Sequence, residues 1–155
     1  MKKIIVGLLA VAFVGFAFTT KQNDEVKVKF EKSAEVVGID FFHGTWEEAL
    51  TKAKKENKLI FLDAYAAWCG PCKRMARTTF MNKEVGDFFN KNFINYKMDM
   101  EKHADGKRLS QKYRLTAYPT LFFIDAKENV AHKTVGGLNN SQAISFGKEA
   151  LSKNQ

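Results

Sequence analysis

The sequence predicts an α/β fold in which a central mixed sheet of four to five strands carries helices on both faces. Residues 59–66 form a nearly continuous apolar run, which is typical of a strand buried on both faces. Segments with helical periodicity alternate with such strands along the chain, as they do in α/β domains. A chain of 155 residues supplies one hydrophobic core of ordinary size. We therefore expect one domain over residues 39–155.

The N-terminal segment differs in kind from the rest of the chain. Two lysines follow Met1, and no residue between positions 4 and 18 is charged. This pattern predicts a signal peptide over residues 1–19, cleaved after Ala17 or Thr19, since a membrane span needs about 20 apolar residues. A retained N-terminal membrane anchor stays open. Residues 20–38 are polar, and we interpret them as an arm that is either loose or an edge strand.

The first elements of the domain are defined by one cap and one apolar run. Residues 39–42 predict a short strand. Thr45 and Glu48 match a capping box, so a helix is predicted over residues 45–56, with Trp46 on its apolar face. The buried strand at 59–66 follows, and a second helix is predicted to start at Cys69.

The later elements continue the alternation. Residues 93–100 alternate in polarity as a second central strand, and Asn139 with Gln142 can cap a last helix. The expected elements are, in order, a helix at 82–90, a strand at 93–100, a helix at 104–113, strands at 120–124 and 130–135 joined as a hairpin, and a final helix to about residue 151.

Cys69 and Cys72 are the only cysteines, and they stand where the buried strand gives way to a helix. A helix N-terminus carries about half a positive charge, which stabilises a thiolate at Cys69 and lowers its pKa below the free value of about 8.5. Cys72 lies one helical turn later and can close a small disulfide with Cys69. We therefore predict a reversible redox pair whose first sulfur is acidic and accessible.

A zinc site is the alternative use of the two cysteines. A zinc half-site would need further ligands at close spacing, but His43, His103 and His132 are scattered, so we expect no metal and no cofactor besides the Cys69–Cys72 disulfide.

The net charge of +8 comes from dispersed lysines that alternate with glutamates. Such a pattern is typical of a solvated face, so no nucleic-acid partner is expected.

The order of several motifs resembles the thioredoxin family. Trp68-Cys69-Gly70-Pro71-Cys72-Lys73 follows a strand, Tyr118-Pro119-Thr120 opens a later strand, and Val135-Gly136-Gly137 precedes the last helix. The resemblance covers about residues 45–151 and implies a thioredoxin fold. Within the family, residues 62–66, Thr79-Phe80 and Lys97-Met98-Asp99 look most like the C-terminal domain of the thiol:disulfide interchange protein DsbD and its exported relatives.

The resemblance assigns roles to the cysteines and to an acid in the apolar strand. Cys69 would attack a partner disulfide, and Cys72 would resolve the mixed disulfide. Asp63 would exchange a proton with Cys72, and Lys97 on the neighbouring strand would tune it. A buried acid of this kind titrates high, because burial disfavours its charged form. The alternative is that Asp63 merely ends a strand.

The resemblance also assigns the surroundings of the dithiol. Pro119 would be a cis-proline that faces the cysteines, although the sequence alone favours an ordinary trans bond. Tyr118, where thioredoxins more often carry an aliphatic residue, would flank the substrate groove. Trp68 would shield the disulfide from an exposed position, the alternative being a core aromatic residue. The Gly70-Pro71 spacer resembles that of reducing thioredoxins.

Together these features predict an extracytoplasmic thiol:disulfide oxidoreductase, periplasmic if the source cell has a periplasm, that reduces protein disulfides. Its expected partners are cysteine-containing exported proteins and a transmembrane thiol carrier that donates electrons. The membrane itself is a partner only if residues 1–19 are retained. Two alternatives remain: a disulfide oxidase or isomerase of exported proteins, and a non-catalytic binding or chaperone module that uses the same groove.

Overall fold

The computed structural model describes residues 37–153. The predicted signal peptide or anchor at 1–19, and all of the predicted arm at 20–38 except its last two residues, lie outside this part of the chain. Within the described residues, no helix has the length and apolar character needed to cross a membrane.

The described residues contain a mixed four-stranded sheet, which confirms the predicted fold class. Its strands are β1 (Ile60–Tyr65), β2 (Ile94–Asp99), β3 (Thr120–Ile124) and β4 (Val130–Val135). They lie in the order β2-β1-β3-β4, with β2 parallel to β1 and each of the other neighbouring pairs antiparallel. The fold is a thioredoxin fold.

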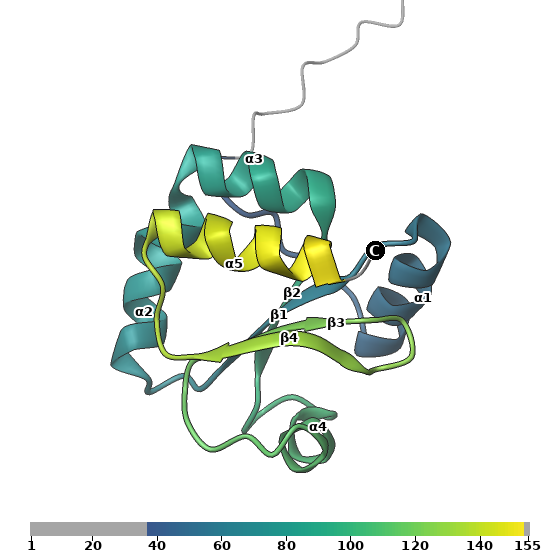
Figure 1. Cartoon of the computed structure of the whole chain (residues 1–155). Helices are drawn as coiled ribbons and strands as arrows, with labels where there is room; N and C mark the ends of the chain where they lie inside the picture. The colour runs from purple at the N-terminus through teal and green to yellow at the C-terminus, as the bar shows by residue number, and fades with distance from the viewer. Residues whose placement is uncertain (1–36, 154–155) are drawn as a thin grey trace, which may run out of the picture. The chain divides into compact units, whose positions relative to one another are not determined.

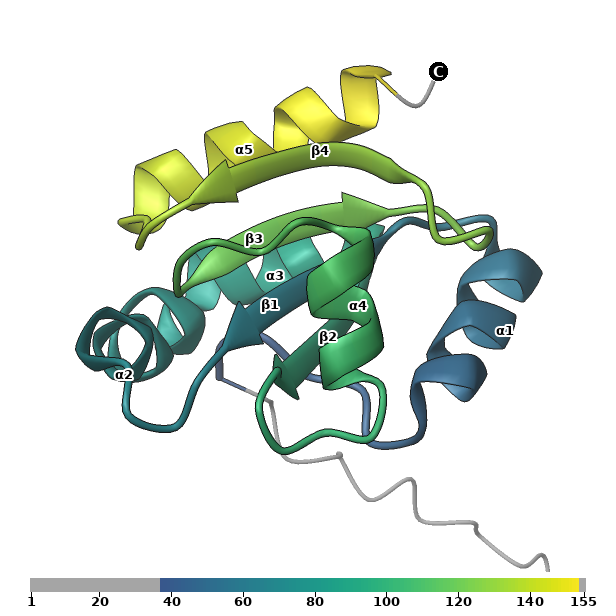
Figure 2. The ribbon, with the colours of Figure 1, turned by 90° about the horizontal axis from the view of Figure 1, so that it is seen from below.

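Helices cover both faces of this sheet. They are α1 (Trp46–Glu56), α2 (Gly70–Arg77), the short 3₁₀ helix η1 (Thr79–Met81), α3 (Lys83–Asn92), α4 (Gly106–Lys112) and α5 (Asn140–Lys153). Figure 1 shows α3 and α5 above the sheet and α4 below it. The view from below in Figure 2 places α4 in front of the strands, with α1 at their side and α5 behind β4.

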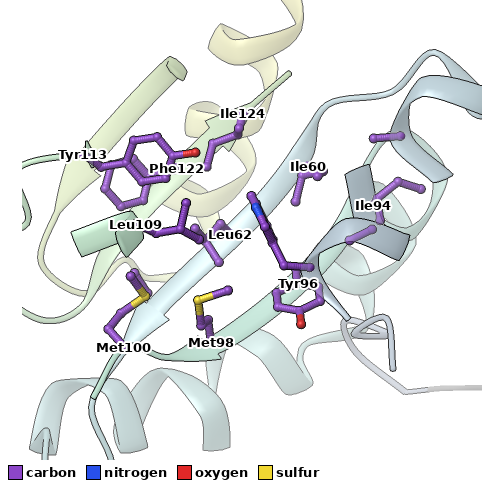
Figure 3. Close-up of a cluster of buried hydrophobic side chains, with 14 residues drawn as sticks. Ile60, Leu62, Ile94, Tyr96, Met98, Met100, Leu109, Tyr113, Phe122 and Ile124 are labelled. Atoms are coloured by element: carbon purple, nitrogen blue, oxygen red, sulfur yellow. The ribbon is translucent and has the colours of Figure 1, made fainter. Parts of the chain in front are cut away.

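The core has two halves because successive side chains of a strand point to opposite faces. One half gathers Leu62 from β1, Met98 from β2 and Phe122 from β3 around Leu109 of α4, together with buried Trp46 of α1 (Figure 3). The other half gathers Phe61, Phe89, Phe93, Phe123 and Phe146 under α2, α3 and α5. Asp63 follows Phe61 at the strand spacing of two, so it belongs to the face that α2 covers.

The helix caps predicted from sequence are present. The Thr45 hydroxyl accepts a hydrogen bond from the Glu48 amide at 3.2 Å, and the Glu48 carboxylate accepts one from the Thr45 amide at 2.8 Å. At the start of α5, Asn139 and Gln142 exchange the same pair of bonds at 3.0 and 2.9 Å. These caps satisfy amide groups that the first turn of a helix leaves without partners.

The predicted short strand at 39–42 is wrong. This segment is extended, but its amides bond to three different elements: Ile39 to the Phe80 carbonyl, Asp40 to the Asn90 side chain and Phe42 to the Asn95 carbonyl. A strand needs successive backbone bonds to one neighbour, and here only Phe42 forms a backbone bond to β2, while the Asp40 carbonyl accepts a hydrogen bond from the Asn95 side chain. The apolar residues of the segment instead pack beside the sheet, with Ile39 and Phe41 against the cluster that contains Phe61.

Strand direction brings the predicted site residues to one edge of the sheet. The parallel strands β1 and β2 end at the same edge, where the chain continues into Cys69 and Glu101 respectively. The antiparallel strand β3 begins there, since Thr120 pairs with both Ala64 and Val135. The CxxC motif, Pro119 and Gly136 therefore meet at this edge, although up to 67 residues separate them in sequence.

Candidate active site

The two cysteines lie at the start of α2, as the sequence predicts. Cys69 is the N-cap residue, and its amide donates to the Ala66 carbonyl at 3.0 Å, which closes the turn after β1. The Cys72 amide donates to the Cys69 sulfur at 3.2 Å. Pro71 occupies the first turn of the helix, where its missing N–H group costs nothing. The Cys69 sulfur is therefore in direct contact with a helix amide that would stabilise its negative charge.

The cysteines form a disulfide whose sulfurs are 2.04 Å apart and whose Cα atoms are 5.3 Å apart. Each cysteine is only 2% exposed, and Tyr65 and Tyr118 pack against the pair. The expectation that the Cys69 sulfur is accessible is thus wrong for the disulfide form. The short motif places the sulfurs between the start of the helix and these two rings, which a reading of spacing alone does not reveal.

Trp68 lies outside the core beside this pair, and it is 67% exposed. Its indole N–H donates to the Glu101 carboxylate at 2.9 Å, and its ring meets the Tyr118 ring edge to face at 5.7 Å. The alternative of a core aromatic residue is excluded for Trp68, whereas Trp46 is fully buried. A cavity of about 370 Å³ opens between Trp68 and residues 115–118, so both aromatic rings border a groove.

The peptide bond between Tyr118 and Pro119 is cis, as the resemblance implies. The Pro119 carbonyl accepts a hydrogen bond from the Gly136 amide at 2.8 Å, which ties the start of β3 to the end of β4. The Tyr118 ring contacts both the disulfide cluster and Trp68. Burial and the nearby carboxylates of Glu101 and Asp99 raise the pKa of Tyr118, so its hydroxyl stays protonated at neutral pH.

Asp63 and Lys97 form a pair inside the sheet beneath α2. They face each other across the parallel β1–β2 register, and Lys97 Nζ lies 2.8 Å from Asp63 Oδ2. Asp63 is 1% exposed, and burial raises its pKa although Lys97 acts in the opposite direction. Because β1 continues to Tyr65, Asp63 does not end a strand, and that alternative is excluded.

Aromatic rings surround the Lys97 ammonium group on its other sides. Its Nζ lies 4.4 Å from the centroid of Tyr65, 5.2 Å from that of Phe80 and 5.8 Å from that of Phe41. Ring faces attract cations, and the side chain keeps 27% of its surface exposed. These rings hold the positive charge beside Asp63 while leaving Lys97 in contact with solvent.

The chain matches the model of a known protein family. The family model described as "Thioredox_DsbH: Protein of unknown function, DUF255" matches residues 28–121, which is more than half of the chain. The chain belongs to this thioredoxin-like family. The CxxC motif, the strands β1 and β2 and the cis bond of the DsbH-type domain lie within the matched segment, whereas β4 lies beyond it.

Individual relatives agree with the family assignment. The DsbH-type domain is 29% identical over 122 residues to the thiol:disulfide interchange protein DsbD of Haemophilus influenzae, covering 77% of this chain and 21% of that protein. It is 37% identical over 86 residues to a thioredoxin of Echinococcus granulosus, covering 55% and 73%. The chain spans only 8% of the spermatogenesis-associated protein 20 of Rattus norvegicus, which it also matches.

A solved structure extends the likeness over nearly a whole protein. The solution structure of a putative disulphide-isomerase from Bacteroides thetaiotaomicron is 41% identical to this chain, with a TM-score of 0.66. The match covers 76% of this chain and 97% of that one. The DsbH-type domain described here therefore has the fold and the close cysteine pair of a thioredoxin-like disulfide oxidoreductase.

Two of the three histidines, His103 and His132, make side-chain contacts that do not involve the cysteines. His103 contacts the Tyr96 hydroxyl at 3.2 Å, and His132 contacts Glu149 at 3.1 Å. No cluster of three or more His, Cys, Asp or Glu side chains suited to a metal ion occurs between residues 37 and 153.

Two features of the site were missed by the sequence analysis. Glu101 holds the Trp68 indole, and Tyr65 contacts both the disulfide and Lys97. Glu101 follows the end of β2, and parallel strands place their carboxyl ends at one edge, so this position could have been found from the strand order. Tyr65 stands two residues after Asp63, hence on the same strand face, and this spacing was the available signal for it.

Proposed function

We propose that this chain is an extracytoplasmic thiol:disulfide oxidoreductase that reduces the disulfides of exported proteins. The observation that carries the proposal is the Cys69–Cys72 pair at the start of α2, placed above a buried acid whose pKa burial raises. A helix N-terminus favours the thiolate of the first cysteine, and a buried acid can take the proton of the second.

The reaction consists of two displacements at sulfur. In the reduced protein, the Cys69 thiolate attacks one sulfur of the partner disulfide, a mixed disulfide forms, and the partner's other sulfur leaves as a thiolate. The Cys72 thiolate then attacks the Cys69 sulfur, which forms the Cys69–Cys72 disulfide and releases the second partner thiolate. The partner gains two electrons, and the dithiol loses two.

Asp63 and Lys97 act on the proton of Cys72 in this scheme. The Cys72 thiol must lose its proton before it can attack, and it is buried. Asp63 accepts that proton, because its raised pKa makes it a stronger base than an exposed carboxylate. Lys97, whose Nζ lies 2.8 Å from the carboxylate, opposes the effect of burial and favours the ionised form of Asp63. Water can carry the proton over any remaining gap.

The spacer between the cysteines and the N-terminal segment support the direction and the partners of the reaction. The Gly70-Pro71 spacer resembles that of thioredoxins, whose potential is about −270 mV, rather than that of strong oxidants near −120 mV. The uncharged segment at 4–18 supports export of the domain. A reductase outside the cytoplasm needs electrons from within, so we expect a transmembrane thiol carrier as donor and cysteine-containing exported proteins as substrates.

A second candidate is a disulfide isomerase of exported proteins. The observation that favours it is the 41% identity to the Bacteroides thetaiotaomicron protein described as a putative disulphide-isomerase. An isomerase shares the fold and the cysteines but operates at a higher potential, about −180 mV, so that its mixed disulfides persist long enough to rearrange.

Equilibrium with glutathione redox buffers separates the two candidates. We expect the Cys69–Cys72 couple to titrate near −270 mV, and a value at or above about −180 mV would exclude the reductase. Reduction of insulin by the full chain, with Cys69→Ser as the inactive control, tests the activity itself. A protein that fails to reduce insulin before the substitution would be a non-catalytic binding module.

A further inference from the structure

A groove of about 800 Å³ lies between α2 and the start of α5, and it shares no lining residue with the Trp68 cavity. Its α2 wall consists of Pro71, Arg74, Met75 and Thr78, whose spacing of three to four residues places them on one helix face. Its other wall is the loop from Gly137 into the first turn of α5. Because Pro71 stands between the two cysteines, the groove begins at the redox motif itself.

The walls of this groove are fixed to each other. The Met75 sulfur accepts a hydrogen bond from the Leu138 amide at 3.3 Å, and Thr79 donates its hydroxyl proton to the Leu138 carbonyl at 2.7 Å. Met75 is buried between α2 and the sheet. Because hydrogen bonds already hold the walls of the groove in place, the protein loses little conformational freedom when a peptide binds there.

Arg74 is the one charged side chain that lines the groove, and Lys73 and Arg77 add two positive charges elsewhere on α2. Lys73, Arg74 and Arg77 are exposed on α2, which has no acidic residue, and none of the three forms an ion pair with another described residue. The groove lining contains no acidic side chain either. By contrast, Arg108 and Lys112 on α4 both form ion pairs with Glu128, and Arg108 forms another with Asp105. The positive end of the α5 helix dipole adds to the same field.

We propose that this groove docks an acidic segment that flanks the disulfide of the protein substrate. The role rests on the proposed function, since it places the segment beside the sulfur that Cys69 attacks. Arg74 in the groove and the other two cations of α2 supply charge complementarity, and the continuity of the groove with Pro71 supplies the position. The docked segment raises the rate of encounter with acidic partners, while the displacement at sulfur is unchanged.

The test compares two synthetic peptides with the same cystine centre. One carries aspartate and glutamate beside the disulfide, and the other carries asparagine and glutamine at those positions. The reduced full chain is mixed with each peptide, and its oxidation is followed in a single turnover at low salt. We expect the acidic peptide to react about tenfold faster, with the advantage shrinking as salt screens the charges. In Arg74→Gln/Arg77→Gln the two peptides react at nearly equal rates.

A matched control removes the same charge elsewhere. Lys54 and Lys55 lie in the last turn of α1 and form no ion pair with another described residue, just as Arg74 and Arg77 lie in the last turn of α2. The variant Lys54→Gln/Lys55→Gln should keep the full preference for the acidic peptide. An equal loss of preference in both double variants would overturn the docking role, because it would reflect net charge alone.

Three other outcomes test the docking role separately from the proposed function. If wild type reduces both peptides at one rate, the docking role is wrong and the proposed reductase stands. If the reduced, folded chain reduces neither peptide, the proposed function itself fails. If Arg74→Gln/Arg77→Gln weakens binding to phosphatidylglycerol vesicles but keeps the peptide preference, this surface meets anionic lipid and the docking role is overturned.

Discussion

Replacing Asp63 by asparagine separates the structural cost of this residue from its chemical use. Asparagine has nearly the shape of a protonated aspartic acid and cannot ionise. Asp63 is 1% exposed, and its carboxylate contacts Lys97 at 2.8 Å. Lys97 keeps 27% of its surface exposed and has three rings around its ammonium group, so it remains solvated and held when the carboxylate is lost.

The sign of the stability change follows from the raised pKa of Asp63. A folded-state pKa above the unfolded value means that ionisation costs the folded protein free energy, so stability falls as pH rises above the ordinary value of 3.8. The loss is complete once pH exceeds the raised folded-state pKa. We therefore expect Asp63→Asn to be more stable than wild type at pH 8 by about 1–3 kcal/mol, and equally stable near pH 3.

The rate at which Cys72 resolves a mixed disulfide tests whether Asp63 acts as its base. A mixed disulfide is made between Cys69 and a small chromogenic thiol, and the release of that thiol by Cys72 is followed at pH 7. Without the base at position 63, release should slow by about a hundredfold. The first attack by Cys69, measured as alkylation by iodoacetamide, should change much less, because Asp63 is assigned to the other sulfur.

Two results would refute this reasoning. If Asp63→Asn is less stable than wild type at pH 8, the ion pair with Lys97 stabilises the fold on balance, and burial does not dominate. If release of the thiol is unaffected while the variant remains folded, Cys72 loses its proton by another route, and Asp63 has no place in the mechanism.

Three further changes have definite expectations. Lys97→Met removes the charge that lowers the pKa of Asp63, so that pKa should rise further and the pH profile of thiol release should move upward. Glu128→Gln should lower stability at pH 7 by about 2 kcal/mol in urea unfolding, a loss that disappears between pH 4.5 and about 2, where wild-type Glu128 gains its proton. Gly86→Ala should destabilise by about 1–3 kcal/mol, because its Cβ would collide with the Gly38 backbone.

Each of these changes has a matched control. Lys97→Arg keeps the charge beside Asp63 and should leave the pH profile nearly in place. The Glu128 figure is modest because its partners Arg108 and Lys112 are 49% and 41% exposed, and equal stability of variant and wild type at pH 7 would show that water replaces both. Gly70→Ala adds the same methyl group in open space, so a stability loss equal to that of Gly86→Ala would contradict the collision.

Local signals were sufficient for most of the fold. Both strands of the hairpin, Thr120–Ile124 and Val130–Val135, have the predicted bounds, since apolar β-favouring runs flank a turn that Asp125 closes by accepting amide bonds. The capping pairs fixed two helix starts for the same local reason. The segment at 39–42 failed because its amide partners, Phe80, Asn90 and Asn95, are about 40 to 55 residues away. No local pattern reports such partners.

The candidate site divides in the same way. The CxxC motif has a local signature, and Asp63 and Lys97 could be placed because each stands in a predicted central strand. The burial of the disulfide depends on Tyr65, the last residue of β1, and on Tyr118, which stands two residues before β3. The Trp68–Glu101 bond joins the loops after two parallel strands. Contacts of this kind depend on register, which polarity patterns alone leave undetermined.

The two sulfurs lie in surroundings that act on them in opposite directions, and this difference sets the order of the reaction. The Cys72 amide, 3.2 Å from the Cys69 sulfur, and the N-terminal end of α2 favour a thiolate at position 69. Cys72 is buried, and in the proposed mechanism it keeps its proton until the Asp63 carboxylate accepts it. In that mechanism, attack by Cys69 uses a charge that is already present, whereas resolution by Cys72 requires an ionised Asp63. Lowering the pH below the pKa of Asp63 should consequently slow resolution by Cys72 and let the mixed disulfide accumulate.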